Sequence, residues 1–251
     1  GSYYKGEHLN DIWGLTTIGI AKSQEEMDAH LAKVDQSSVG TNWGVGDIMY
    51  ADLDGDGKIS NGTNKLGDTG DYRIIGNSTP RFKYGITLDA AWKGFDFSIF
   101  MQGIGKRDLW LDGCYFWGAN GQGNEWQSTG FAEHWDFFRP EGDPLGANLN
   151  SYYPRVNFSG DRNTKVQTRY LQNGAYLRLK NVQLGYTLPR VWTEKAGISS
   201  VRVYVSGDNL ATITSLSKIF DPEATGSLAG TGSGKLYPLQ RVISVGVNVN
   251  F

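Results

Sequence analysis

Hydrophobic and polar residues alternate along five segments of the chain, the pattern of β-strands whose two faces meet different surroundings. On the first segment, the apolar face carries Phe82, Tyr84, Ile86, Leu88, Ala90 and Trp92. The apolar faces of the other four carry Phe95, Phe97, Ile99 and Met101; Val182, Leu184, Tyr186 and Leu188; Val201, Val203 and Val205; and Ile243, Val245, Val247, Val249 and Phe251. The opposite faces are small and polar, so the sequence predicts an all-β, antiparallel fold.

Alternation of this kind has two explanations. Segments of about ten residues are long enough for tilted strands to cross a membrane as part of a β-barrel. A soluble antiparallel sandwich with one wet face produces the same alternation. The pattern alone leaves the two architectures open.

The connections between the segments favour the barrel. Lys93-Gly94 is a tight hairpin and Pro189–Ser200 a modest turn, whereas residues 103–174 and 210–238 form long polar connections. Long structureless loops are uncommon in compact soluble domains. Outer-membrane barrels combine short periplasmic turns with long extracellular loops. We therefore expect 103–174 and 210–238 to be extracellular loops and the short turns to face the periplasm.

Two further features agree with a transmembrane β-barrel. Aromatic residues lie at or beside the short turns, where an interfacial girdle would form: Trp92, Phe95, Tyr186 and Trp192. The last strand ends on the aromatic Phe251, a terminus suited to recognition by barrel-assembly machinery. Only residues 23–34 indicate a helix, a short one within a loop, with Ser23 as N-cap and Glu26 three residues later.

An acidic loop at residues 52–71 is the sharpest local motif. Its start, Asp52-Leu53-Asp54-Gly55-Asp56-Gly57-Lys58-Ile59, matches the first half of a calcium loop. Thr63 occupies the twelfth position, where an acid is expected, so Asp68 or Asp71 would supply the last ligand. The predicted structural calcium site comprises Asp52, Asp54, Asp56, Lys58 and Asp71. The alternative is an Asp/Gly turn without a metal.

Aromatic residues crowd the connection that follows the second strand. The predicted ligand or partner loop contains Trp110, Tyr115, Trp117, Trp126 and Trp135, interleaved with Gly, Asn and Gln. Exposed rings beside amides suit stacking on sugars or burial against a partner protein. Packing of the loops on one another would explain the same rings equally well.

Composition excludes several classes of function. The net charge of -2 gives no basic field to attract nucleic acid. The three histidines are scattered and the one cysteine is isolated, so neither a zinc site nor a disulfide framework is predicted. Glu133, Asp136, Glu141 and Asp143 resemble glycosidase carboxylates only in residue type. With no Walker or G-x-S-x-G motif, the sequence predicts a protein that is not an enzyme.

Several stretches together resemble the SusC/RagA family of TonB-linked outer-membrane transporters of Bacteroidetes. Beyond the acidic loop, they are Asp71–Gly85, Trp92–Gly103, Tyr176–Pro189, Val203–Leu210, Asp221-Pro222-Glu223 and Tyr237-Pro238-Leu239. The resemblance spans nearly the whole of residues 1–251 and departs from the family pattern in the insert Ser60–Gly70.

The resemblance implies a function that the residues do not show by themselves. Members form 22-stranded barrels with an N-terminal plug and a TonB box, and they pair with a SusD-like surface lipoprotein. They import oligosaccharides, and in some members peptides, with energy passed through TonB. This chain resembles only about the last quarter of such a protein. We therefore expect the C-terminal strands of a bacterial outer-membrane transporter. The alternative is a soluble, calcium-dependent carbohydrate-binding β module.

Overall fold

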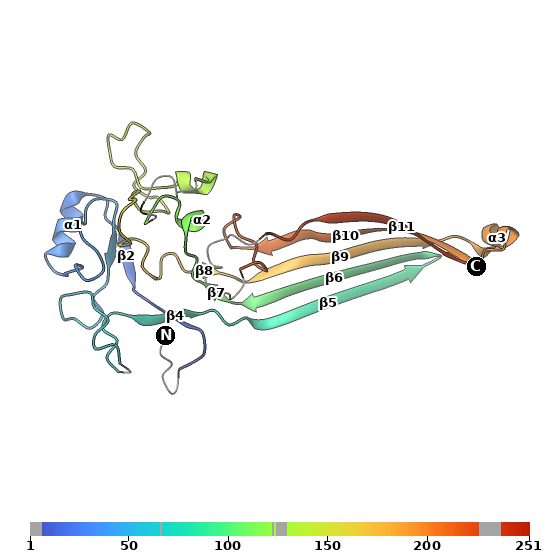
Figure 1. Cartoon of the computed structure of the whole chain (residues 1–251), viewed down its shortest axis with the longest axis horizontal. Coiled ribbons are helices and arrows are strands. Elements are labelled where there is room, and N and C mark those ends of the chain that lie inside the picture. Colours follow the sequence, from blue (N-terminus) through green and yellow to red (C-terminus); the bar gives the residue numbers. More distant parts are fainter. Residues whose placement is uncertain (1–6, 66, 122, 124–129, 226–236) are drawn as a thin grey trace. The chain divides into compact units, whose positions relative to one another are not determined.

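The computed structural model describes residues 7–65, 67–121, 123, 130–225 and 237–251 (Figure 1). The chain divides into two compact units. The first unit comprises Gly1–Thr79, Asp108–Gln172 and Thr225–Lys235, and the second comprises Pro80–Arg107, Asn173–Ala224 and Leu236–Phe251.

The second unit is built on one antiparallel sheet with the strand order β11-β10-β9-β6-β5. Its strands are β5 (Arg81–Trp92), β6 (Phe95–Lys106), β9 (Tyr176–Thr187), β10 (Ser200–Thr214) and β11 (Val242–Asn250). All five predicted strands are therefore present. Because β5 and β11 are the free edges, the described residues form an open wall and not a closed barrel.

The tight hairpin after β5 is confirmed. Lys93 and Gly94 both have positive φ angles, 47° and 87°, as a two-residue type I′ turn requires. The connection from β9 to β10 is more than a turn, because it contains the short helices α3 (Arg190–Thr193) and η3 (Glu194–Ala196).

Two predicted loop boundaries were wrong because strands continue past them. β6 runs on to Lys106, since its Gly103 leaves room for the Tyr84 ring and the Tyr176 carbonyl, which a Cβ would meet at 2.5 and 2.4 Å. β10 runs on to Thr214 through a bulge between Asp208 and Ala211. The long connections thus begin after Lys106 and after Thr214.

The first unit contains short elements joined by long segments. β1 (Asp11–Gly14) pairs with β4 (Arg73–Asn77), and β2 (Thr17–Ile20) pairs with β3 (Ile48–Tyr50), both antiparallel. The helices are α1 (Gln24–Leu31), α2 (Cys114–Trp117) and η2 (Ala132–Trp135). Two short strands, β7 (Asp108–Leu109) and β8 (Gln172–Asn173), fall where the chain passes from one unit to the other.

The predicted loop helix is confirmed at its start. The Ser23 side chain accepts a hydrogen bond from the Glu26 N–H at 3.2 Å, and the Glu26 carboxylate accepts one from the Lys22 N–H at 2.6 Å. The helix ends at Leu31 rather than at Val34.

The segment predicted as a long extracellular loop contributes to a packed core. Phe116, Trp117, Tyr153 and Tyr170 are buried together with Tyr50 from β3. The Tyr50 hydroxyl donates a hydrogen bond to the Arg162 carbonyl at 2.7 Å. The described residues between 108 and 172 are therefore a folded part of the first unit.

Among the described residues, no helix is both long enough and apolar enough to cross a membrane.

Candidate functional site

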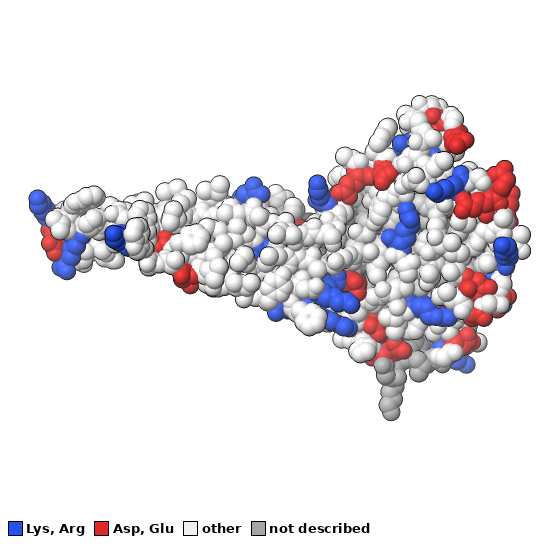
Figure 2. Space-filling model, turned by 180° about the vertical axis from the view of Figure 1, so that it is seen from behind, with Lys and Arg blue, Asp and Glu red and all other residues white. Residues whose placement is uncertain are grey.

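One face of the five-stranded sheet is continuously apolar. The strand register aligns Trp92 with Phe95, and Val203 with both Tyr186 and Val247, so the predicted apolar faces merge. Exposed members of this apolar face are Ile86, Leu88, Phe97, Leu184, Val205, Ile213, Ile243, Val245 and Val249. Figure 2 shows few charged side chains over the strands of this unit. Exposed apolar patches of this extent mark an interaction with a partner or a membrane.

The opposite face, the polar face, holds paired charges. Arg202 on β10 reaches across β9 to Asp96 on β6, with its Nε donating to Oδ2 at 2.8 Å. The route passes over Gly185, where a Cβ would lie 2.4 Å from the Asp96 carboxylate. A side chain at this position would have to displace the Asp96–Arg202 pair.

A second charge network ties the segment after β10 to β9. Arg178 is buried and donates to Asp221 at 2.7 Å, while Lys180 pairs with Glu223 at 2.9 Å. The Arg178 Nε also donates to the Thr212 hydroxyl at 2.8 Å. Sequence reasoning missed this network because its partners are 43 residues apart. The one available signal was the Asp221-Pro222-Glu223 stretch in the family resemblance.

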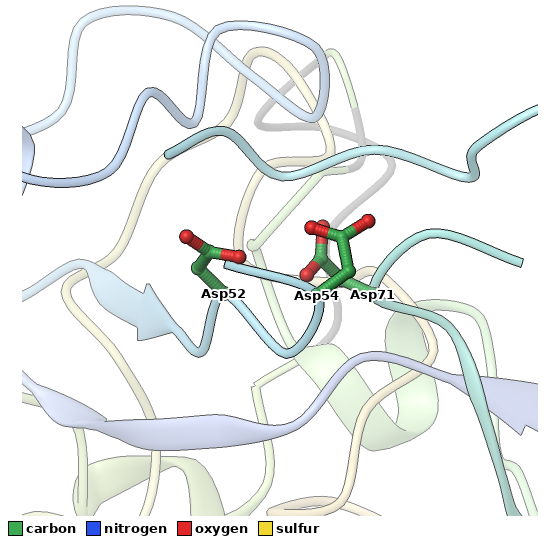
Figure 3. Close-up of side chains that lie close together, drawn as sticks. All are labelled: Asp52, Asp54 and Asp71. Atoms are coloured by element: carbon green, nitrogen blue, oxygen red, sulfur yellow. The ribbon is translucent and has the colours of Figure 1, made fainter. Parts of the chain in front are cut away.

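The acidic loop brings three carboxylates together (Figure 3). Oxygens of Asp52 and Asp54, after β3, lie within 4.8 Å of an oxygen of Asp71, before β4. Two ligands of one calcium ion, each about 2.4 Å from it, lie up to about 4.8 Å apart, so the spacing fits. Of the two predicted late ligands, Asp71 is in the cluster, whereas Asp68 accepts hydrogen bonds from Thr63.

Hydrogen bonds and charge set the protonation of this cluster. The Gly57 N–H holds the pKa of Asp52 below its ordinary value. For Asp54, the Asp56 N–H lowers the pKa, but partial desolvation and the charges of Asp56, Asp71 and Asp52 outweigh it and raise the pKa. A cation would relieve that repulsion.

The remaining predicted metal ligands lie outside the cluster. Asp56 faces Lys58, whose ammonium lies 3.4 Å from its carboxylate.

Asp71, a member of the cluster, is buried. Its two carboxylate oxygens accept hydrogen bonds from the N–H groups of Leu53 and Ser60 at 2.6 and 2.7 Å. The clustered donor set is therefore Asp52, Asp54 and Asp71.

The predicted aromatic loop separates into packed and exposed rings. Trp117 is buried, and its ring lies 5.9 Å from that of the half-buried Trp110. The ring of Tyr115 meets Phe131 edge-on at 5.4 Å. Trp135 is 60% exposed and lies over the Arg139 guanidinium at 5.5 Å. Of the predicted rings that the structure describes, Trp135 is thus the best placed to meet a ligand or partner.

The two other predicted site residues are Trp126 and Phe251. Trp126 falls outside the described residues. Phe251 follows β11, which ends at Asn250, and its side chain is 90% exposed.

Two curated relatives match almost the whole chain. Both are TonB-dependent receptors of Formosa agariphila: receptor P3 is 33% identical and receptor P26 is 30% identical, each over 98% of this chain. The chain spans only 22% and 23% of their respective lengths. No protein-family model matches the chain.

Solved structures show the same fold. The RagAB peptide importer in its open-open state superposes with a TM-score of 0.63 at 22% identity, covering 96% of this chain and 22% of that one. A RagAB peptide transporter structure superposes equally well at 23% identity. The strands described above are therefore arranged as in part of a much longer chain.

Proposed function

Since this chain belongs to the SusC/RagA-type TonB-dependent receptors, we propose that it forms part of the barrel wall of an importer in the bacterial outer membrane. The continuous exposed apolar face of the sheet carries the proposal, because such a face is stable against lipid and costly against water. The polar face, with its paired charges, would line the interior and the solute path.

The solute would be a nutrient too large for simple diffusion, an oligosaccharide or a peptide. The name of the RagAB structures identifies that relative as a peptide importer. For this chain, the exposed Trp135 supports a ligand or a SusD-like lipoprotein approaching the first unit. The rest of the barrel, the plug and contact with TonB would come from the remaining length of such a receptor.

Calcium bound at the acidic loop would stabilise the first unit. The convergence of Asp52, Asp54 and Asp71 supports this role, as does the electrostatic repulsion that raises the pKa of Asp54. The ion would be structural, joining the segment after β3 to the segment before β4.

Membrane extraction of the full-length receptor tests the barrel proposal. We expect the protein to fractionate with outer membranes, to require detergent for monodispersity, and to migrate faster on gels before heating than after. A protein that is monodisperse in plain buffer would contradict the proposal. That result would favour the soluble, calcium-dependent carbohydrate-binding module instead.

A further inference from the structure

Basic side chains on the polar face differ in how they are neutralised. Along β9 and β10, the three basic residues Arg178, Lys180 and Arg202 each contact a carboxylate within 3 Å. Where β5 begins and β6 ends, the polar face carries Arg81, Lys83 and Lys106. Within the described part of the chain, none of these three has an ion-pair partner.

Arg81, Lys83 and Lys106 lie close together, so without a counter-charge they repel one another. Arg81 and Lys106 are directly opposite each other in the β5–β6 register, and Lys83 lies two residues further along the same face. Like charges directly opposite across two strands repel each other, with Cβ atoms about 5 Å apart. Asp89, the carboxylate of β5, is six residues from Lys83, or about 20 Å along the strand.

A hollow lies beside these cations on the same unit. A cavity of about 470 Å³ is lined by Lys83, Gly85, Phe100, Gln102, Ile104 and Tyr176, among others. A Cβ at Gly85 would meet the Phe100 ring at 3.2 Å, so the glycine leaves that ring room to lie against the strand. The cavity thus combines a cation, an amide and aromatic side chains, a set that holds an anionic group on one side and an apolar surface on the other.

We propose that this end of the polar face is a binding site for a carboxylate-bearing solute. Lys83 would pair with the carboxylate at the cavity, Gln102 would donate a hydrogen bond, and Phe100 and Tyr176 would contact the solute's carbon frame. Arg81 and Lys106 would draw the anion toward the site through the local positive field. The inference rests on the proposed function, in which the polar face lines the solute path and this end opens outward.

Calorimetric titration of the detergent-purified, full-length receptor tests the site. The probes are trigalacturonate and triglutamate, each compared with a neutral counterpart, maltotriose and trialanine. We expect at least one acidic probe to bind more tightly than its neutral counterpart, and that probe identifies the carrier of the carboxylate. Binding should weaken as salt concentration rises.

Variants locate the binding to this cavity. Lys83→Gln should weaken binding of the acidic probe about tenfold, the loss expected for one charged hydrogen bond. Lys83→Arg should retain it, and Arg81→Gln with Lys106→Gln should reduce the salt dependence. Lys93→Gln is the matched control, because it removes one lysine from the opposite end of β5 and should leave binding unchanged.

Two results would overturn the inference: acidic and neutral probes binding the parent alike, or Lys83→Gln binding the acidic probe as tightly as the parent does. Heat-modifiable migration of each variant establishes that its barrel is folded. Because outer-membrane location is measured separately, a receptor that is correctly located but shows no charge preference would refute the carboxylate site alone and leave the barrel proposal intact.

Discussion

Arg155 and Asp47, which are 108 residues apart in the sequence, form a bidentate ion pair. Its Nε donates to Oδ1 at 2.7 Å and its Nη2 donates to Oδ2 at 2.6 Å. Asp47 is fully buried and also accepts hydrogen bonds from the Asn163 amide and the Gly44 N–H. This carboxylate therefore joins the segment before β3 to the later segment 155–163.

Removing that charge should loosen the first unit. Asp47→Asn leaves Arg155 without its counter-charge, and breaking a buried pair in this way costs about 3 kcal/mol. Limited proteolysis of the full-length receptor should show faster cleavage in residues 108–172. Asp161→Asn is the control, because it breaks the more exposed pair with Lys165, worth about 0.5 kcal/mol at most. Equal resistance of both variants would contradict the role given to Asp47.

The two faces of β11 should respond differently to a charge. Val247 lies on the apolar face opposite Val203, and Asn248 lies on the polar face opposite Arg202. Val247→Arg should cost about 2–4 kcal/mol in an outer-membrane folding assay, because it places a charge against lipid. Asn248→Arg should be tolerated far better. Equal tolerance would refute the assignment of the faces.

Glycines on the polar face should resist substitution. A Cβ at Gly185 would lie 2.5 Å from the Arg202 guanidinium, and one at Gly246 would lie 2.3 Å from the Tyr204 ring. We expect Gly185→Ala and Gly246→Ala each to lower the thermal stability of the full-length receptor by about 1 kcal/mol, the low end for overpacking, because the atoms that must shift are the ends of side chains. Gly19→Ala should serve as a control, since nothing lies within 4 Å of the position that its Cβ would take. A melting temperature unchanged by Gly185→Ala would refute the close packing.

Calcium binding should depend on pH through Asp54. Its pKa is raised, so it takes up a proton at a higher pH than an ordinary aspartate as the solution is acidified. Calcium requires ionised ligands. The calcium affinity measured by titration should therefore be highest near neutral pH and should fall as the pH drops through the raised pKa of Asp54. Asp54→Asn should weaken calcium binding throughout, whereas Asp68→Asn should not. Equal calcium affinity for Asp54→Asn and the parent would contradict the site.

Two tryptophans of the aromatic loop should separate stability from recognition. Trp117 is buried, so Trp117→Ala should destabilise the first unit by about 3–5 kcal/mol. Trp135 is exposed, so Trp135→Ala should leave thermal stability nearly unchanged and reduce co-purification of a SusD-like partner or ligand binding. A large loss of stability with Trp135→Ala would show that its ring packs instead of binding.

The sequence by itself determined the strands, their faces and the tight hairpin. Period-two alternation fixes which side chains share a face, because successive residues of a strand point in opposite directions. The Lys93-Gly94 turn and the Ser23 cap depend on neighbouring residues only, so local chemistry was enough to predict them.

The tertiary structure decided everything that depends on distant partners. The sequence placed Gly103 in a loop, whereas in the structure it lies in β6, and the Tyr84 ring and the Tyr176 carbonyl occupy the space that a Cβ would need. Asp71 rather than Asp68 joins Asp52 and Asp54 because the chain returns beside them only after the insert. The placement of Arg81 opposite Lys106 arises from strand register. The contact of buried Arg178 with Asp221 arises because the segment after β10 folds back onto β9. Register sets which charges meet, and no local pattern encodes it.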